Sequence, residues 1–446
     1  MTTRSAFHGM RSFLILWSGQ TVSALGTSLG SFALGVWIYE KTGSATQFAM
    51  ISFVVGLVYI VANPLGGALA DRWDRRLILA LSNIGAALMT LITAALLFTK
   101  RLEPWHVYPL VALMSGVFTL GGPALLSSIS LLVPREQLAR ASGMIQTSRA
   151  AAQIIGPLSA GLLVGHMGYS GLVLCDGLSF LVAMAAILFI RIPRPSASEV
   201  KERPSMLASL AFGWKYLRRL PGLFALQGLY GVTNFCMGMV QVLLTPLILS
   251  FATPIELGSV NSAGAAGILL GSLALSIWGG TRRRVVAILS LLASQALILF
   301  LGGVRPSIPL IALASFTFMV TLPFVNGFTQ ILLQSKVAAE VQGRVFGVAG
   351  VISMASVPLA SLIAGPLADR VFEPMLIPGG ALADSVGRVI GVGEGRGVGF
   401  LFVLLGAMVL VVVGLASLNP RLRRLESEIP DALPERISPE PALQDA

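Results

Sequence analysis

Apolar runs of about 20 residues recur along the whole chain, and the short segments between them hold most of the charged residues. A run of this length crosses a bilayer as a helix, because a helix satisfies its own backbone hydrogen bonds in lipid. Only 11% of the residues are charged, whereas soluble domains carry roughly 25%. The sequence therefore predicts an all-α polytopic membrane protein.

Twelve such runs are present, and an even number places both termini on one side of the membrane. Of the 31 Lys and Arg residues, seven fall in segments on the other side and one, Arg149, falls inside a run. All the others share the side of the termini, so the positive-inside rule predicts that both termini are cytoplasmic and that the location is the plasma (cell inner) membrane. This distribution also argues against a nucleic-acid partner, although the net charge is +11. The runs lie near residues 13–39, 47–70, 77–99, 107–132, 142–165, 169–190, 222–250, 257–278, 285–303, 308–333, 345–368 and 398–418.

One long cytoplasmic connection divides the runs into two sets of six. It predicts an N-terminal six-helix bundle over 1–191, a cytoplasmic linker over 192–221 and a C-terminal six-helix bundle over 222–419. The segment Ser205–Arg219 in the linker has the pattern of an amphipathic helix at the inner membrane surface. Residues 420–446 are rich in proline and charge, which predicts a disordered tail. The glycine-rich run 391–397 is expected to be a flexible external loop, and the whole connection 370–398 is unusually long and could cover the outer mouth.

The two sets of runs show a weak internal duplication. Pro157 in the fifth run and Pro358 in the eleventh are 201 positions apart, and Glu136 and Glu340 precede them at an offset of 204. Transporters are often built from two such repeats. Chance similarity between membrane helices rich in glycine and proline is the alternative explanation.

The strongest local pattern ends the second run, where five charges fall within the six residues Asp71 to Arg76. Charges are costly in hydrocarbon, so they mark a membrane surface. Gly67, Leu69, Asp71 and Arg72, followed by basic residues, resemble the signature of the major facilitator superfamily, although Asp74 stands where that superfamily often has glycine. The resemblance implies twelve transmembrane helices in two pseudo-symmetric six-helix bundles.

A second pattern resembles the macrolide-efflux and siderophore-exporter branch of the drug:proton antiporters. Gly156, Pro157 and Gly161 are similar to the antiporter motif of the fifth helix, with Ala160 in place of one glycine. Further similarities to the branch are Trp17–Gln20, Asp176–Phe180 and Gly343–Phe346.

The branch implies a secondary active transporter that exports an amphipathic small molecule, such as a drug, a macrolide-like metabolite or a siderophore, by proton-coupled alternating access. A nutrient or lysolipid importer of the same fold, and a non-transporting membrane receptor, are the alternatives. An enzyme is not expected, because His, Cys and acidic residues do not cluster at membrane depth and no phosphate-binding loop is found. The expected partners are a small-molecule substrate and membrane lipid. The chain is expected to be a monomer that uses the proton gradient, with no metal or other cofactor.

The resemblance also implies a conformational latch on the cytoplasmic side. There Asp71 would bind free backbone N–H groups at the start of the eleventh helix, around Gly343. Topological marking alone is the simpler reading of these charges. The second half carries a degraded copy of the signature from Gly271, with Leu275 in place of the aspartate, so the first half would supply the acid. The latch residues are Gly67, Asp71, Arg72, Arg75, Arg76, Gly343 and Arg344.

Two ionisable residues lie well inside the runs and are the candidates for proton coupling, Asp176 and Arg149. Charged groups at membrane depth often mark ion or substrate pathways. A structural cap for Asp176, and structural pairing or an anionic substrate group for Arg149, are the alternatives. The substrate-cavity candidates are buried amides, which also bind neighbouring helices: Gln20, Gln146, Gln153, Asn234, Gln241, Asn326 and Gln330.

Overall fold

The computed structural model describes residues 3–133, 137–190, 206–338 and 341–428, and within these ranges the regular elements are all helical. The long helices and the linker helix are α1 (Thr3–Thr42), α2 (Ala45–Arg72), α3 (Arg75–Phe98), α4 (Pro104–Leu132), α5 (Leu138–Leu188), α6 (Met206–Arg219), α7 (Pro221–Leu249), α8 (Pro254–Trp278), α9 (Arg284–Val304), α10 (Ile308–Lys336), α11 (Gln342–Leu367) and α14 (Arg396–Leu418). The short elements are the π-helical turn η2 (Ala368–Phe372), α12 (Glu373–Leu376), α13 (Gly387–Ile390), α15 (Pro420–Arg423) and α16 (Leu425–Glu428).

Eleven helices in the described ranges are long and apolar enough to cross a membrane. One of them, α5, has 51 residues and is interrupted at Gly168, whose φ of 65° and ψ of 176° lie outside the helical region. Glycine adopts this backbone conformation without a steric penalty. The two parts of α5 match the fifth and sixth predicted spans, so the prediction of an all-helical membrane protein with twelve spans is confirmed.

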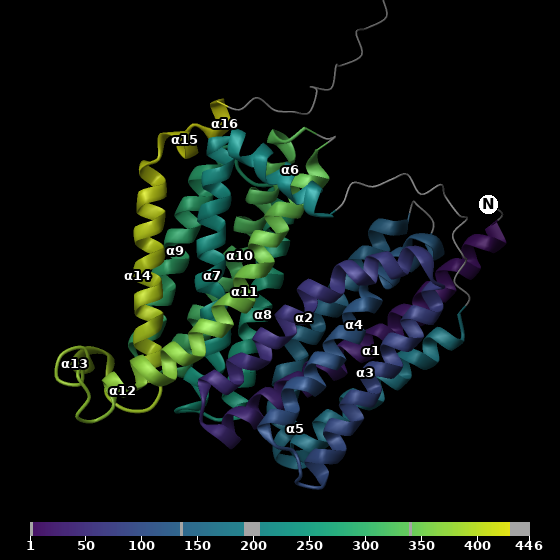
Figure 1. Cartoon of the computed structure of the whole chain (residues 1–446), viewed down its shortest axis with the longest axis horizontal. Coiled ribbons are helices and arrows are strands. Elements are labelled where there is room, and N and C mark those ends of the chain that lie inside the picture. The colour runs from purple at the N-terminus through teal and green to yellow at the C-terminus, as the bar shows by residue number, and fades with distance from the viewer. Residues whose placement is uncertain (1–2, 134–136, 191–205, 339–340, 429–446) are drawn as a thin grey trace, which may run out of the picture.

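The helices form two groups, α1 to α5 and α7 to α14 (Figure 1). The groups meet through α2 with α11 and through α5 with α8. In Figure 1 they converge toward the end that holds α12 and α13, which we call the loop end. They diverge toward the opposite end, which holds the N-terminus, α6, α15 and α16 and which we call the terminal end. The molecule is therefore sealed between its halves nearer the loop end.

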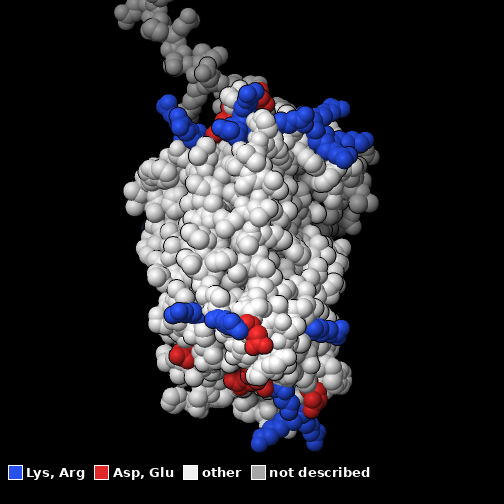
Figure 2. Space-filling view, turned by 90° about the vertical axis from the view of Figure 1, so that its left-hand side faces the viewer, with Lys and Arg blue, Asp and Glu red and all other residues white. Residues whose placement is uncertain are grey.

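Charge is separated along the same axis. Figure 2 shows, on the face that it presents, a broad band without charged residues between two charged ends. Lys and Arg dominate the terminal end, and acidic and basic residues mix at the loop end. A band of this kind is what a helical bundle exposes to hydrocarbon.

Small residues determine how closely α1 packs on the second part of α5. A Cβ atom added to Gly19 would lie 2.7 Å from Cβ of Ala186, and one added to Gly30 would lie 2.6 Å from Oδ2 of Asp176. Small residues let helix backbones approach closely in membranes. The sequence of α1 thus places its glycine face directly against the one acidic residue of α5.

The linker helix predicted at 205–219 is present as α6, while residues 191–205 lie outside the described ranges. Helix α6 packs on the start of α11. A Cβ atom on Gly213 would collide with the carbonyl oxygen of Arg344, and the Arg344 guanidinium lies 4.7 Å from the ring centre of Phe212. This amphipathic helix therefore rests on the protein as well as having an exposed side.

The predicted disordered tail is wrong for residues 420–428, which form α15 and α16. Leu422 and Leu425 are 1% and 0% exposed. The Glu426 carboxylate accepts a hydrogen bond from the Arg284 backbone N–H at the start of α9, at 2.9 Å. The two leucines find apolar surface beside α7 and α9, which a composition averaged over the whole tail does not indicate. Residues 429–446 lie outside the described ranges.

The connection 370–398 is also more ordered than expected. It contains part of η2, together with α12 and α13. The Glu373 carboxylate accepts hydrogen bonds from the backbone N–H groups of Gly395 at 3.2 Å and Val398 at 3.1 Å. Gly393 also donates to the Leu376 carbonyl at 2.9 Å, so the run 391–397 is held in place and the expectation that it is flexible is wrong.

Candidate functional site

A cavity of about 900 Å³ lies between the two groups of helices. All five helices of the first group line it, and the second group contributes Gln241, Val242 and Val357. Among the described lining residues, Arg149 and Asp176 are the charged ones, and most of the others are apolar or carry hydroxyl or amide groups. A large apolar cavity with a few convergent polar groups is typical of a small-molecule site.

Asp176 is buried in the cavity wall, with 3% of its surface exposed. The Thr27 hydroxyl on α1 donates a hydrogen bond to its Oδ1 at 3.1 Å. Among the residues that the structure describes, no cation pairs with this carboxyl group. An acid at membrane depth without a cationic partner is costly, and such residues commonly mark ion or substrate pathways.

Arg149 reaches the same cavity from the first part of α5, and its side chain is exposed. Within the described ranges it makes no hydrogen bond or ion pair, so the structural pairing considered from the sequence is not found there. Arg149 and Asp176 therefore place charges of opposite sign in one cavity wall.

Two amides add polar atoms without partners to this cavity. Within the described part of the chain, Nε2 of Gln20 and Oδ1 of Asn83 are buried and lack a hydrogen-bond partner. The Asn83 Nδ2 donates to the Leu79 carbonyl at 2.8 Å, which fixes the orientation of that amide. A buried polar atom without a partner costs about 1–3 kcal/mol. A bound molecule that pairs with these atoms would recover part of that cost.

The predicted cavity amides do not all line the same cavity. Gln20 and Gln241 line the central cavity, while Gln153, together with Gln241, lines a second cavity of about 270 Å³ against α8 and α10. Gln146 and Gln330 are exposed and line neither of these two cavities, so their role in substrate binding remains a prediction.

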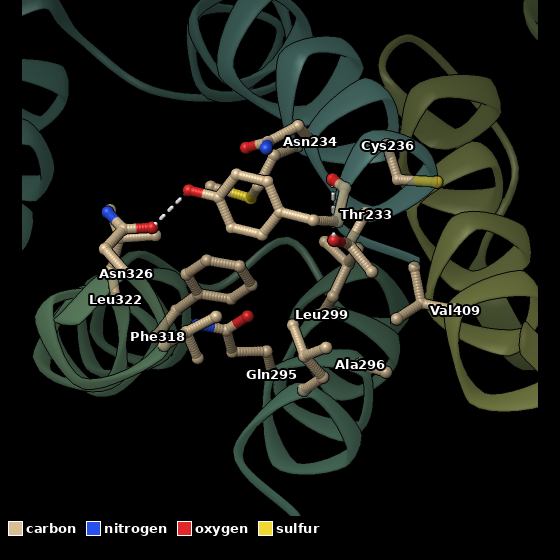
Figure 3. A pocket seen from close by; sticks show the side chains of 14 residues that line it. Thr233, Asn234, Cys236, Gln295, Ala296, Leu299, Phe318, Leu322, Asn326 and Val409 are labelled. Carbon is tan, nitrogen blue, oxygen red and sulfur yellow. Dashed lines mark hydrogen bonds between the residues drawn. The ribbon is translucent and has the colours of Figure 1, made fainter. Parts of the chain in front are cut away.

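Asn234 and Asn326 line a third, smaller pocket inside the second group of helices (Figure 3). Its volume is about 30 Å³, enough for about one water molecule. The Tyr230 hydroxyl donates to Oδ1 of Asn326 at 2.5 Å, while Nδ2 of Asn234 is buried and has no partner in the described part of the chain. These two residues therefore line a pocket other than the central cavity, and the side chain of Asn326 is also exposed.

A polar face of α3 was not predicted. Ser82, Asn83, Thr90 and Thr93 all line the central cavity. Their positions fall within about 100° around a helix of 3.6 residues per turn. That spacing in an otherwise apolar helix is a signal that the sequence does contain.

Part of the predicted latch has local structural contacts. Oδ1 of Asp74 accepts a hydrogen bond from the Arg76 N–H at 2.9 Å, so the residue that departs from the signature is the N-cap of α3. The Arg76 guanidinium donates to the carbonyls of Ile187 at 3.2 Å and Leu188 at 2.7 Å, at the end of α5. Both contacts stay within the first group of helices.

The rest of the latch is less fully described. Gly67, Asp71 and Arg72 are helical in α2, but their side chains lie outside what the structure describes, and Arg75 begins α3. Gly343 and Arg344 are exposed at the start of α11. The predicted contact between Asp71 and this helix start remains a prediction.

The antiporter-like residues of α5 lie in the seal near the loop end. A Cβ atom on Gly161 would lie 2.7 Å from the Pro254 carbonyl oxygen of α8, and one on Gly258 of α8 would collide with the Pro157 carbonyl oxygen. Gly156 instead faces Ser28 of α1. The duplicated proline Pro358 also contacts the opposite half, because a Cβ atom on Gly56 would lie 2.5 Å from it.

The fold and the central cavity define a membrane transporter of two helical bundles. Residues 16–361 match the family model of the Major Facilitator Superfamily, and the chain belongs to that superfamily. It is a multi-pass membrane protein with the architecture that the signature predicted.

Among curated proteins, the chain is 28% identical over 369 residues to macrolide efflux protein A of Streptococcus pyogenes, a match that covers 80% of this chain and 90% of that protein. It is 26% identical to the multidrug efflux pump Tap of Mycolicibacterium fortuitum, covering 80% of this chain and 88% of the pump. The relatives found are therefore efflux proteins, as the sequence resemblance predicted.

Two solved structures show the fold. A bacterial homologue of the human lysosomal transporter Spinster, in an inward-facing and unoccupied conformation, superposes with a TM-score of 0.70 at 14% identity, covering 94% of this chain and 97% of that one. A mutant of the nucleoside transporter NupG gives a TM-score of 0.66 at 14% identity, covering 91% of this chain and 99% of that one.

Proposed function

We propose that this chain is a proton-coupled exporter of amphipathic small molecules that works by alternating access and has no enzymatic activity. The central cavity supports this proposal, because its mostly apolar wall also carries the acidic Asp176 and the basic Arg149. The amides of Gln20 and Asn83 add buried polar atoms that have no hydrogen-bond partner among the described residues. The efflux relatives support export and favour drugs or macrolide-like compounds over siderophores. The chain would act as a monomer driven by the proton gradient, with membrane lipid around it and no cofactor.

The terminal end would face the cytoplasm of a plasma membrane. Lys and Arg gather at that end (Figure 2), and cytoplasmic loops carry an excess of these residues. With this orientation the halves are joined near the external side and diverge toward the cytoplasm, which corresponds to an inward-facing state. A substrate from the cytoplasm or the inner leaflet would then enter between the diverging helices.

The observation that carries the proposal is the Asp176 carboxyl group in the wall of this cavity without a cationic partner among the described residues. We infer that Asp176 takes up a proton when the cavity faces outward and releases it to the cytoplasm when a substrate binds. Thr27 orients the carboxyl group through its hydroxyl, and Arg149 provides a positive charge elsewhere in the same cavity. Competition between proton and substrate for one cavity couples the two fluxes.

The test is transport by the purified protein in proteoliposomes with an imposed pH gradient and a panel of amphipathic compounds. We expect accumulation that depends on the gradient, its loss in Asp176→Asn, and its retention in Asp384→Asn, the same exchange at an exposed position. Unchanged transport by Asp176→Asn would move the coupling site elsewhere. Movement of compound in the same direction as protons would identify an importer.

A further inference from the structure

Acidic side chains accept hydrogen bonds from backbone N–H groups at several helix starts in the described ranges. Four of them act within their own half of the molecule: Asp74 at α3, Glu256 at α8, Glu373 at α14 and Glu426 at α9. Asp369 differs from these four, because it lies in η2 of the second half and binds the start of α2 in the first half. Asp369 therefore makes a carboxylate contact of this kind across the two halves.

The contact is extensive. Oδ2 of Asp369 accepts hydrogen bonds from the Ser44 hydroxyl at 2.7 Å and from the Thr46 N–H at 2.9 Å, and Oδ1 accepts one from the Ala45 N–H at 3.0 Å. Free N–H groups at a helix start favour an anion. Gly365 permits the approach, because a Cβ atom there would collide with the backbone of Thr46.

The sequence around Asp369 repeats the signature at the end of α2. Residues 365–370 read Gly-Pro-Leu-Ala-Asp-Arg, and residues 67–72 read Gly-Ala-Leu-Ala-Asp-Arg. The two copies end two helices that pack on each other across the halves. The end of α11 contacts the start of α2 at the loop end, whereas the end of α2 lies toward the terminal end (Figure 1).

We propose that Asp369 is a positioning residue of the transport cycle that holds the external side closed, as the counterpart of the cytoplasmic latch predicted for Asp71. This inference rests on the proposed orientation and on alternating access. Opening the external side separates the end of α11 from the start of α2, so the three hydrogen bonds exist in the inward-facing state and are replaced by water in the outward-facing state. The two aspartates stabilise opposite states of one equilibrium.

The test measures the distance between spin labels on the external ends of the two halves, in protein reconstituted into nanodiscs. Cysteines at Arg101 and Val389, both exposed, carry the labels, and the native Cys175 and Cys236 are replaced by alanine. We expect Asp369→Asn to raise the ratio of outward-open to inward-open molecules about fivefold to tenfold, the effect of losing one carboxylate helix cap. Asp369→Glu should restore part of the closed population.

Glu426→Gln is the matched control, because it removes a carboxylate that likewise binds backbone N–H groups at a helix start, and its hydrogen bonds stay within the second half. It should leave the distance distribution unchanged. Asp71→Asn should shift the distribution in the opposite direction to Asp369→Asn. A wild-type distribution in Asp369→Asn, or an equal shift in Glu426→Gln, would overturn the proposal.

If Asp369→Asn does not give a monodisperse protein, Ser44→Ala replaces it, since this variant removes one hydrogen bond of the same contact. A wild-type distribution in Ser44→Ala, or an equal shift in the control variant, would then overturn the proposal. Transport by the wild-type protein is scored separately. A correct shift in distance without gradient-driven transport would contradict the proposed function and leave the external latch in place.

Discussion

The close contact between α5 and α8 near the loop end predicts that a single added methyl group shifts the equilibrium between the inward-open and outward-open states. In Gly161→Ala the added Cβ would lie 2.7 Å from the Pro254 carbonyl oxygen and 3.0 Å from Cα of Ile255. Overpacking of this kind costs about 1–3 kcal/mol. The cost applies only while the external ends of the helices are together, so the outward-open population should rise about fivefold to 150-fold, because 1.4 kcal/mol corresponds to tenfold.

Gly165→Ala is the matched control. Gly165 lies one turn further along α5, and an added Cβ would meet nothing within 4 Å. Both variants gain the helix propensity of alanine, roughly 0.5–1 kcal/mol, and this gain is the same in both conformations. The difference between the variants therefore isolates contact with α8.

The assay is the distance distribution between labels at Arg101 and Val389. Gly161→Ala should increase the long-distance population, and Gly165→Ala should match the wild type. An equal effect of the two substitutions, or no effect of Gly161→Ala in a well-folded protein, would refute the claim that the contact of α5 with α8 holds the external side closed.

Three further predictions concern single contacts. Thr27→Val removes the hydroxyl that orients Asp176 and should lower the initial rate of gradient-driven transport severalfold, while Thr99→Val, a change at an exposed helix end, should not. Leu425→Ala truncates a side chain with 0% exposure and should destabilise the protein by about 2–5 kcal/mol, seen as a lower midpoint of thermal unfolding; an unchanged midpoint would contradict the ordered tail. Asp74→Ala removes the N-cap of α3 and should lower stability by about 1 kcal/mol without stopping transport; loss of transport at unchanged stability would assign Asp74 to the latch instead.

The helical architecture could be predicted from the sequence because hydrocarbon imposes length and composition on each span. The break at Gly168 appears in the sequence as a pause between two apolar runs, and the charge clusters mark the helix ends. The order in 420–428 could not be predicted, because it depends on two leucines meeting a surface formed by distant helices. The average composition of the tail does not show whether the folded helices offer a surface against which these two leucines can pack.

The candidate site was predicted only in part. Asp176 and Arg149 stand out because ionisable residues are rare at membrane depth, and the structure places both in the central cavity. Amides are less distinctive, because they also bind neighbouring helices: Gln20 and Gln241 line the central cavity, whereas Gln146 lines neither of the two larger cavities. Asp369 was missed because its partner Ser44 is 325 residues away, a distance over which sequence alone indicates no contact.

The central claim is that a proton and a substrate compete for one cavity through Asp176. Its most direct test is the change in pH when a transported amphipathic compound is added to purified protein in unbuffered solution. We expect wild-type protein to release protons in proportion to the compound bound, and Asp176→Asn to bind the compound without releasing protons. Equal proton release by both proteins, or substrate binding by the wild type with no release, would contradict the claim.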